Sequence, residues 1–414
     1  MKKFEVLIIG GGTAGIMVAS QLKKARPSLS IGLIEPSETH YYQPAWTLVG
    51  ANTYDFADTA RSMGTLIPQG VEWIKDYAAS FDPEQNIMVS ASNESYNYQY
   101  LVVCPGLKID PTLVDGLEEA MDKDQVCSNY TDPEHTWEVL KNFKGGTALF
   151  TQPTTPIKCG GAPQKIMYLA ADHIRRSNLA DKSNIIFATP GTVIFGIPRI
   201  ASTLMKVVDR HDINLRFGYE LVRVDANKKI AWYKMADHEK EYNHKEVEEF
   251  RENGLIGIHY DMMHLAPPQS PPDFIKNSSL SNQDGWVDVD HQTLQHNTFK
   301  NIFGLGDVAG LPTAKTGAAI RKQAPIVVAN IMKLMDQDLL TDRKYNGYSS
   351  CPLITGYGKM VLAEFDYDNK FTPDPKLKQM LVFDSAKEHW RLWILKKYVL
   401  PYLYWNKMMK GKDV

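Results

Sequence analysis

The stretch MKKFEVLIIGGGTAGIMVASQLKKARPSLSIGLIE, residues 1–35, predicts a dinucleotide-binding unit. Between an apolar run and a helical stretch it carries Gly10, Gly12 and Gly15 with the spacing GxGxxG. The first glycine permits a tight turn, the second lets the backbone approach a pyrophosphate, and the third lets the helix lie close to the strand. Glu35 ends the next apolar run, where it can accept hydrogen bonds from ribose hydroxyls. We therefore expect a dinucleotide at the helix N-terminus; glycines that serve only the turn are the alternative.

The composition excludes several classes of protein. A chain of 414 residues is long enough for two or three domains with a well-buried core. The formal net charge is −2 and no basic stripe interleaves with aromatic residues, so we expect no nucleic-acid partner. Four cysteines without a CxxC or a nearby histidine pair argue against a metal site and against a secreted disulfide scaffold. A globular enzyme whose only disulfide is catalytic fits these limits.

Two later segments indicate which dinucleotide is bound. YLVVCPG predicts a strand that ends at Pro105 and Gly106, and NIFGLGDVAGLPTAKTGAAIRKQA predicts a strand that presents Gly306 and Asp307 before a helix. The second segment resembles the second flavin fingerprint of the FAD-dependent oxidoreductases with two dinucleotide-binding domains, in which the aspartate contacts the ribityl chain. This resemblance implies FAD as cofactor. Asp307 also fits a helix N-cap, and the two roles are compatible.

The predicted fold is α/β, with two Rossmann-like domains and a C-terminal amphipathic region that anchors to a membrane. We expect a discontinuous FAD-binding domain over 1–110 and 276–345, a second, NAD-like domain over 111–275, and a region for quinone and membrane contact over 346–414. The strand expected at 184–189 is followed by PGTVIFG, which lacks the GxGxxG spacing and so disfavours a nicotinamide cofactor. The proline-rich HLAPPQSPPD excludes a continuous helix and is expected to return the chain to the first domain.

Seven motifs follow one another along the chain: HYYQPAW, IKCGGAPQKIMYLA, LAPPQSPPD, GWVDVDHQTLQH, GLGDVAGLPTAKTGAA, SSCPLITGYGKMVLAEFDY and LPYLYWN. Together, and in this order, they resemble the sulfide:quinone oxidoreductases, in particular the mitochondrial-type (type II) group that also occurs in bacteria. The resemblance runs almost end to end. It implies oxidation of sulfide with electrons passed through FAD to a membrane quinone. The sulfane sulfur would go to a small acceptor such as glutathione, sulfite, cyanide or a second sulfide.

The same resemblance assigns roles to two cysteines. Carried over by motif, Cys159 is the thiol nearest the flavin, and Cys351 holds the sulfur from sulfide as a persulfide. Thiol exchange suits this pair, because its rate follows the thiolate fraction and the pKa of the leaving thiol. Lys158, Lys165 and the expected helix start after Cys159 would lower a thiol pKa. The alternatives are small buried hydrophobes for the cysteines and solvated surface charges for the two lysines. Cys104 and Cys127 are expected to be core or bystander thiols.

Further residues are expected around the flavin. HYYQPAW supplies Gln43 and Pro44 as cofactor contacts, and Lys315 is placed to reach the pyrimidine edge and stabilise the reduced ring. A surface lysine at a helix N-terminus is the alternative for Lys315. The quinone is expected on the flavin face opposite the thiols, and core packing is the alternative for the aromatic candidates there. The candidates for quinone binding are Tyr357, Phe383 and Lys396.

The C-terminal stretch AKEHWRLWILKKYVLPYLYWNKMMKGKDV combines aromatic and aliphatic residues with lysines and an arginine. It is too polar to span a bilayer, and Pro401 is expected to divide it into two amphipathic helical pieces. We expect an interfacial anchor that reaches quinone in the bilayer. A helix packed on the protein's own core or at the contact of a homo-oligomer is the alternative. MKKFEVLIIG lacks a signal-peptide cleavage site, so the expected location is the cytoplasmic face of a bacterial inner membrane, with monotopic attachment.

Three other functions stay open at this point. A type II NADH:quinone oxidoreductase would share the fold but would need a nicotinamide fingerprint and not the two cysteines. The flavin subunit of a cytochrome-linked sulfide dehydrogenase would carry a secretory leader and a protein-docking face in place of a lipid anchor. A flavin-binding regulator would keep the fingerprints and turn over poorly with quinone.

Overall fold

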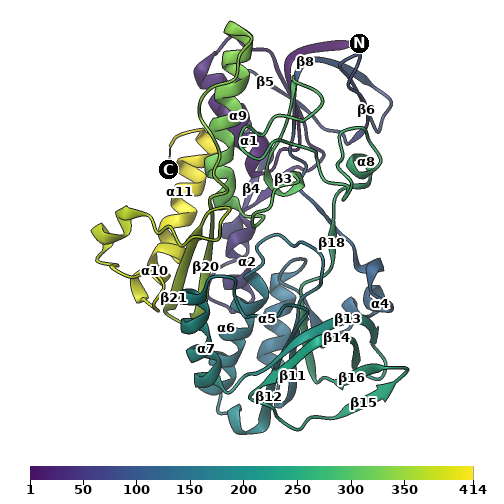
Figure 1. The fold of residues 1–414 in the computed structure, drawn as a ribbon, viewed down its shortest axis with the longest axis vertical. Helices are drawn as coiled ribbons and strands as arrows, with labels where there is room; N and C mark the ends of the chain where they lie inside the picture. Colours follow the sequence, from purple (N-terminus) through teal and green to yellow (C-terminus); the bar gives the residue numbers. More distant parts are fainter. Residues whose placement is uncertain (414) are drawn as a thin grey trace.

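Two β-sheets organise the protein, of which the computed structural model describes residues 1–413 (Figure 1). The first sheet has seven strands in the order β5-β2-β1-β8-β7-β6, with β19 beside β8. Its strands are β1 (Lys2–Ile9), β2 (Ile31–Ile34), β5 (Val71–Ile74), β6 (Ala78–Asp82), β7 (Ile87–Ser90), β8 (Ser95–Val103) and β19 (Ile302–Gly304). Helices α1 (Thr13–Ala25) and α9 (Gly317–Gln337) pack against each other in this half.

The strand, turn, helix and strand predicted from the first 35 residues are confirmed. β1 pairs in parallel with β2 and β8, and the inner part of each strand is buried because helices cover the sheet. The turn from β1 to α1 takes only residues 10–12. This short turn is possible because Gly10 has a φ of 99°, in the region that glycine tolerates.

The second sheet has eight strands in the order β10-β17-β11-β12-β13-β14-β16-β15. They are β10 (Val126–Cys127), β11 (Gly146–Thr151), β12 (Ser183–Thr189), β13 (Asn214–Asp225), β14 (Ile230–Tyr242), β15 (Glu249–Glu252), β16 (Leu255–His259) and β17 (Met262–Leu265). Its helices are α4 (Leu117–Met121), α5 (Pro133–Asn142), α6 (Ala162–Arg176) and α7 (Pro198–His211). Five strands pair in parallel and β13 to β16 add antiparallel pairs, so the predicted α/β class with two Rossmann-like sheets is confirmed.

The chain passes between the two sheets twice, at one place. β9 (Lys108–Ile109) on the way out pairs with β18 (Gln269–Ser270) on the way back (Figure 1). β18 lies in the proline-rich segment that was predicted to return the chain, and the helix after it, α8 (Asp273–Lys276), is a single turn. The exact domain boundaries stay a prediction.

The C-terminal region connects the two halves. The hairpin β20 (Ser349–Gly356) and β21 (Lys359–Phe365) packs on α6 of the second half. The chain then forms α10 (Trp390–Ile394), a π-helical turn (Leu395–Val399) and α11 (Leu400–Asn406), and the 3₁₀ turn Met408–Lys410 packs on α1 of the first half. Figure 1 shows this yellow segment lying along α9.

Two expectations for local structure are wrong. Pro401 does not divide the C-terminal helix, because it occupies the first turn of α11, where its missing N–H is tolerated, and the irregularity is the π-helical turn before it. Asp307 is not the N-cap of the following helix. It lies in the 3₁₀ turn Gly306–Val308, and α9 is capped nine residues later by the Thr316 hydroxyl, which accepts from the N–H of Ala319.

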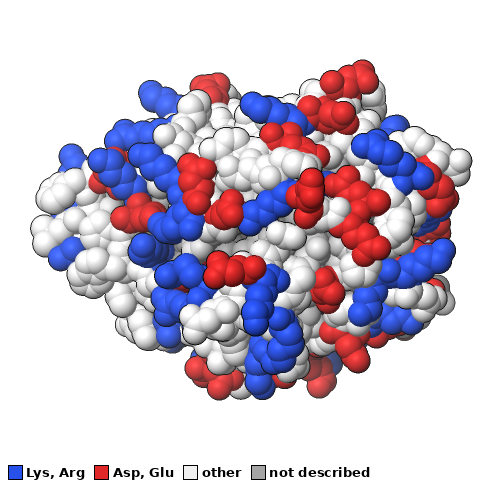
Figure 2. Space-filling view, turned by 90° about the horizontal axis from the view of Figure 1, so that it is seen from below, with Lys and Arg blue, Asp and Glu red and all other residues white. Residues whose placement is uncertain are grey.

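The other short elements are β3 (Thr39–Tyr41), α2 (Trp46–Val49), β4 (Ala60–Ser62) and α3 (Met63–Leu66). Within residues 1–413, no helix combines the length and the apolar character needed to cross a bilayer. Figure 2 shows basic and acidic side chains interspersed over the lower end of the molecule, so this face carries no large field of one sign.

Candidate active site: two thiols beside buried lysines

The two cysteines singled out in the sequence come together where α6 packs on β20. Cys159 lies in the loop that leads into α6, and Cys351 lies in β20. Both are free thiols, Cys351 buried and Cys159 half-buried. Gly161 makes the approach possible, since a Cβ at this position would lie 2.4 Å from the Cys351 sulfur. The fold therefore makes the two cysteines neighbours.

A buried lysine contacts the first thiol. Lys165 is 2% exposed, and its Nζ donates to Cys159 Sγ at 3.0 Å. A hydrogen bond from the Cys351 thiol, joined by the charge of Lys165, holds the pKa of Cys159 well below its usual value against the effect of burial. The same hydrogen bond, with burial, raises the pKa of Cys351 well above its usual value. The two thiols are thus unlike: their surroundings favour ionisation of Cys159 and oppose ionisation of Cys351.

A second lysine reaches the thiols from the C-terminal helix. Lys396 lies in the π-helical turn, is 2% exposed, and donates from Nζ to the Pro44 carbonyl oxygen at 2.7 Å. Burial, followed by the charge of Lys165, lowers the pKa of Lys396 to about 7, while both thiols act to raise it. Lys396 was predicted to bind quinone on the side away from the thiols; the structure instead groups it with them.

The other predicted quinone contacts lie among different neighbours. Tyr357, in the turn of the hairpin, donates from its hydroxyl to the Ala51 carbonyl oxygen at 3.0 Å and packs under Arg176. Phe383 is 76% exposed on the chain that leads to α10.

The backbone around Cys159 is held from three sides. Cys159 has a φ of 53°, which is uncommon for a residue with a side chain. Its N–H donates to the Lys315 carbonyl oxygen at 2.7 Å, and its own carbonyl oxygen accepts from the N–H of Ala162 at 2.7 Å and from the hydroxyl of Tyr130 at 3.2 Å. Tyr130 is 5% exposed, and burial, then the charges of the two thiols, raises its pKa. Sequence reasoning missed Tyr130, because nothing local to KDQVCSNYTDP marks it as a neighbour of Cys159.

The glycine turn of the first sheet has the shape that a dinucleotide needs. A Cβ at Gly10 would lie 2.6 Å from the Cys104 carbonyl oxygen, and a Cβ at Gly15 would lie 1.9 Å from the Gly10 carbonyl oxygen. A Cβ at Gly12 would meet nothing within 4 Å, and Gly12 caps α1 without any side-chain hydrogen bond. The free N–H groups of α1 therefore face open space, which fits a pyrophosphate.

Glu35 supports this turn. Its carboxylate accepts from the N–H of Gly11 and from the N–H of Ser37, both at 2.7 Å. Each carboxylate oxygen can accept more than one hydrogen bond, so the predicted ribose contact is compatible with these partners. Glu35 thus holds the β1–α1 turn against the end of β2.

The second fingerprint lies between the glycine turn and the thiols. Gly106 has a φ of 79° and open space around its Cα, and Asp307 stands next to Gly306, whose φ is 75°. Burial raises the pKa of Asp307, and the charges of Lys315 and Lys158 act in the opposite direction. A carboxyl group between cations is suited to polar groups of a bound flavin chain.

Lys315 is turned toward the protein in this structure. Its Nζ donates to the carbonyl oxygens of Asp307 at 2.6 Å and Ala309 at 3.2 Å, and it lies 3.7 Å from the centre of the Trp286 ring. Burial lowers the pKa of Lys315 to about 8. The predicted contacts Gln43 and Pro44 are also bonded to lysines. The side-chain oxygen of Gln43 accepts from Lys158 Nζ at 2.7 Å, and the carbonyl oxygen of Pro44 accepts from Lys396 Nζ as described above.

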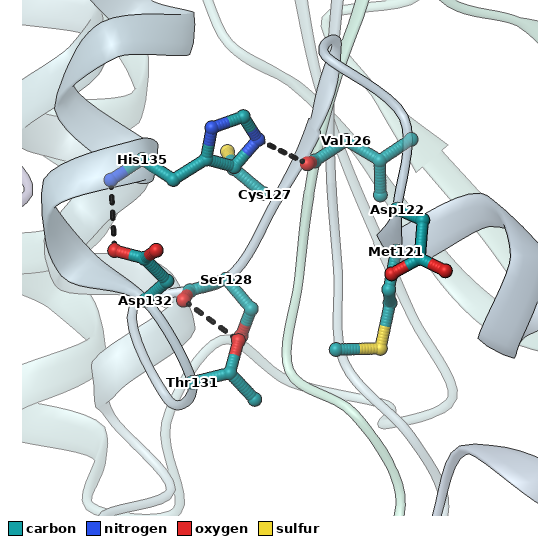
Figure 3. Close-up of a pocket in the computed structure, with 8 residues that line it drawn as sticks. All are labelled: Met121, Asp122, Val126, Cys127, Ser128, Thr131, Asp132 and His135. Carbon is teal, nitrogen blue, oxygen red and sulfur yellow. Dashed lines mark hydrogen bonds between the residues drawn. The ribbon is translucent and has the colours of Figure 1, made fainter.

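A cavity of about 240 Å³ lies away from this site, beside Cys127 (Figure 3). Its polar groups serve the protein: His135 Nε2 contacts the Val126 carbonyl oxygen at 3.0 Å, and the Asp132 carboxylate caps α5 by accepting from the N–H of His135. Burial raises the pKa of Cys127 to about 12. Cys127 is therefore a protonated thiol in the core, and Cys104, also buried, points its thiol at the Gly10 carbonyl oxygen.

The fold defines a class, the oxidoreductases with two dinucleotide-type domains. The family described as pyridine nucleotide-disulphide oxidoreductase matches residues 4–142. The mitochondrial sulfide:quinone oxidoreductase of Mus musculus is 39% identical over 99% of this chain and 87% of the relative. That of Dictyostelium discoideum is 40% identical over 99% of this chain and 86% of the relative. The chain belongs to the sulfide:quinone oxidoreductase family, and it is an oxidoreductase enzyme.

A solved structure agrees on the fold. The sulfide:quinone oxidoreductase from Aquifex aeolicus superposes with a TM-score of 0.77 over the whole of this chain and 92% of that chain, at 19% sequence identity.

Proposed function

We propose that the protein oxidises sulfide and passes the electrons through FAD to a membrane quinone, with Cys159 and Cys351 as the redox pair. The observation that carries the proposal is the unlike pair of adjacent thiols. Cys159 is a thiolate bonded to Lys165 at 3.0 Å, and Cys351 is a buried thiol beside it. The names of the relatives supply the substrate and the acceptor.

The pKa difference assigns the roles in the sulfur chemistry. Hydrosulfide attacks the Cys351 sulfur of the oxidised pair, so that the bond between the cysteines breaks, a persulfide forms on Cys351, and Cys159 leaves as thiolate. Thiol exchange proceeds fastest when the leaving thiol has the lower pKa, and that thiol is Cys159. The small acceptor then removes the outer sulfur from Cys351. The Cys159 thiolate and the Cys351 thiol then re-form their disulfide and release two electrons and the Cys351 proton.

FAD would receive these two electrons and hand them to the quinone. The open turn at Gly12 would hold the pyrophosphate on the N-terminus of α1, and Glu35 would contact the ribose. Gly106 and Asp307 would line the ribityl chain and the ring, between the glycine turn and the thiols. The cationic groups of Lys165 and Lys396 would attract anionic hydrosulfide to the thiols.

The C-terminal region would bring the enzyme to the lipid. Of the twelve exposed large hydrophobic side chains in the described part of the chain, seven lie between positions 381 and 402: Leu381, Phe383, Trp390, Ile394, Tyr398, Val399 and Tyr402. Arg391 and Lys397 stand over Trp390 and Tyr398 as cation–π partners. Aromatic rings with adjacent cations are typical of a surface that lies in the headgroup region of anionic lipid.

A stopped-flow experiment tests the relay. Purified protein is mixed with sulfide in the absence of quinone, and the flavin absorbance is followed in the wild type, Cys159→Ser and Cys351→Ser, with Cys127→Ala as the control for a buried thiol outside the site. We expect sulfide to bleach the flavin in the wild type and the control only, and a soluble quinone to restore the colour. Bleaching that survives both serine substitutions would show direct reaction of sulfide with the flavin and refute the thiol relay.

A further inference from the structure

The C-terminal helix is joined to the glycine turn by a chain of buried hydrogen bonds. Tyr404, in α11, is 4% exposed, and its hydroxyl lies 2.6 Å from His40 Nε2 and 2.7 Å from the hydroxyl of Thr13. Thr13 is the first residue of α1. On its other side His40 is 4% exposed and contacts the Gly11 carbonyl oxygen through Nδ1 at 3.2 Å.

The donors and acceptors in this chain can be assigned from its ends. The Gly11 carbonyl oxygen can only accept, so His40 Nδ1 carries the proton and donates. His40 is held neutral, because burial lowers its pKa to about 4, and its Nε2 is then an acceptor. The hydroxyl of Tyr404 therefore donates to His40 and accepts from the hydroxyl of Thr13. Each polar side-chain atom in the chain has a partner, and the Tyr404 hydroxyl has two, one as donor and one as acceptor.

Packing supports the same junction. Tyr404 lies with its ring centre 4.6 Å from that of Tyr42, and the hydroxyl of Ser20 in α1 donates to the Met409 carbonyl oxygen at 2.9 Å. Further on, a Cβ at Gly411 would lie 2.8 Å from the backbone carbon of Ser20, so the chain runs very close to α1. These contacts bind α11 and the turn after it to the face of α1.

We propose that Tyr404 and His40 form a latch through which the C-terminal helix holds the glycine turn in its cofactor-binding shape. Gly11 and Thr13 flank Gly12, where the free N–H groups of α1 begin. Both flanking residues are bonded to the latch, one through its carbonyl oxygen and the other through its hydroxyl. Tyr404 and His40 are positioning residues, because they act on the cofactor only through the turn.

The latch also connects the cofactor end of the molecule to the thiols. Lys396 lies in the π-helical turn that leads directly into α11, eight residues before Tyr404. Release of α11 from α1 would therefore disturb both the glycine turn and the cation beside Cys159. The inference rests on the proposed binding of FAD at this turn, and it does not depend on which substrate reduces the flavin.

The test compares two tyrosines two positions apart. Tyr404→Phe removes the hydroxyl of the latch, and Tyr402→Phe removes a hydroxyl from a side chain that is 59% exposed. Each holoprotein is diluted, and release of FAD is followed by the rise in flavin fluorescence. We expect Tyr404→Phe to release FAD roughly tenfold faster than wild type, since His40 and Thr13 lose a buried partner. Tyr402→Phe should match wild type.

Thr13→Val supplies a second route in case Tyr404→Phe does not fold, and it should accelerate release by a smaller factor. Hydrogen exchange adds a readout without turnover: because coupling is reciprocal, bound FAD should slow exchange of the backbone at 400–413 relative to the apoprotein. Equal rates of FAD release in Tyr404→Phe, Thr13→Val and wild type would overturn the latch. So would hydrogen exchange at 400–413 that proceeds at the same rate with and without bound FAD.

The outcomes separate the latch from the proposed function. If Tyr404→Phe releases FAD at the wild-type rate while sulfide still bleaches the wild-type flavin, the latch is refuted and the proposed function is supported. If Tyr404→Phe releases FAD faster but sulfide does not bleach the wild-type flavin, the latch is supported and the proposed function is refuted. A wild-type protein that binds no FAD would refute both.

Discussion

The two sheets follow the same α/β plan but treat the turn after their nucleotide-type strand differently. In the first half, β1 reaches α1 through residues 10–12, and the open space at Gly12 faces the helix N-terminus. In the second half, β12 ends at Thr189 and α7 begins only at Pro198. A long connection and a proline in the first turn of the helix leave no tight cradle of N–H groups there.

The second half uses its helix termini for another purpose. The connection from β11 to α6 presents Cys159 just before the helix, and Lys165 in the first turns of α6 bonds its sulfur. In β13, the strand after α7, Arg216 is fully buried and forms an ion pair with Glu249 at 2.5 Å. The charge of this arginine is therefore paired with a carboxylate of the protein itself. One layout therefore carries an open glycine turn in the first half and a cysteine bonded to a buried lysine in the second.

The largest expected effect is the failure of NADH as a donor. Because the second half lacks the tight glycine turn, millimolar NADH should leave the flavin of the holoenzyme oxidised, whereas sulfide bleaches it. The measurement is anaerobic absorbance at the flavin band with each donor in turn. Bleaching by NADH as fast as by sulfide would contradict the difference inferred between the two turns and favour a type II NADH:quinone oxidoreductase.

The second prediction compares one glycine substitution in the turn after β1 with one in the connection after β12. In Gly15→Ala the new Cβ would lie 1.9 Å from the Gly10 carbonyl oxygen, and we expect a cost of about 3 kcal/mol, or roughly 100-fold in FAD affinity. In Gly191→Ala the new Cβ meets its nearest atom, the Thr189 hydroxyl oxygen, at 3.5 Å, so FAD affinity should not change. FAD content and titration of the apoproteins measure the difference. Equal losses in the two variants would contradict the distinct roles of the two turns.

The third prediction concerns the thiol site of the second half. Lys165→Met removes the cation bonded to Cys159, so the pKa of Cys159 should rise by at least about one unit, and the thiolate fraction below that pKa should fall about tenfold. Lys158→Met serves as the matched control, since Lys158 Nζ bonds Gln43 instead. The rate of alkylation of the reduced protein by iodoacetamide against pH reports the pKa. A pKa shift in the control as large as in Lys165→Met would contradict the assignment.

The smallest effect compares one buried histidine from each half. Burial lowers the pKa of His40 to about 4 and that of His264 to about 3. The folded state therefore binds fewer protons than the unfolded state below the usual histidine pKa of about 6.5, so stability is retained above that pH and is lost as the pH falls toward the folded values. Between pH 7 and 5.5 each histidine should remove about 1 kcal/mol from the free energy of unfolding.

Urea unfolding at several pH values measures this slope. His40→Gln and His264→Gln should each flatten it, and the exposed His238→Gln should leave it unchanged. A slope that none of these substitutions alters would assign the acid sensitivity to other groups.

Much of the first half was predictable from the sequence. The spacing of Gly10, Gly12 and Gly15 between an apolar run and a helix indicates a local backbone shape, because only a residue without Cβ fits the close approaches at Gly10 and Gly15, while Gly12 leaves the helix N-terminus open. The strands and the helix around them followed from periodicity, and the absence of the same spacing after β12 indicated the different turn in the second half.

The end of the chain was predicted less well. Its mixture of aromatic and basic residues indicated an amphipathic helix, but the sequence did not show that the helix passes Pro401 without a break. Nor did it show that Tyr404 and His40 meet at the glycine turn. Lys396 was assigned to a quinone site because its real neighbours, the two thiols, are remote in the chain.

By itself, then, the sequence indicated the glycine turn and the α/β class and singled out the two cysteines that the fold brings together, since these depend on local spacing and on motifs. Only the tertiary structure decided the chemistry of the thiols. Cys351 and Lys396 reach Cys159 because β20 packs on α6 and the C-terminal helix docks on α1. In that packing the hydrogen bond from Cys351 and the charge of Lys165 lower the pKa of Cys159 against the effect of burial, and the same hydrogen bond together with burial raises the pKa of Cys351. A pKa that depends on burial and on a neighbour distant in the chain cannot be derived from local pattern.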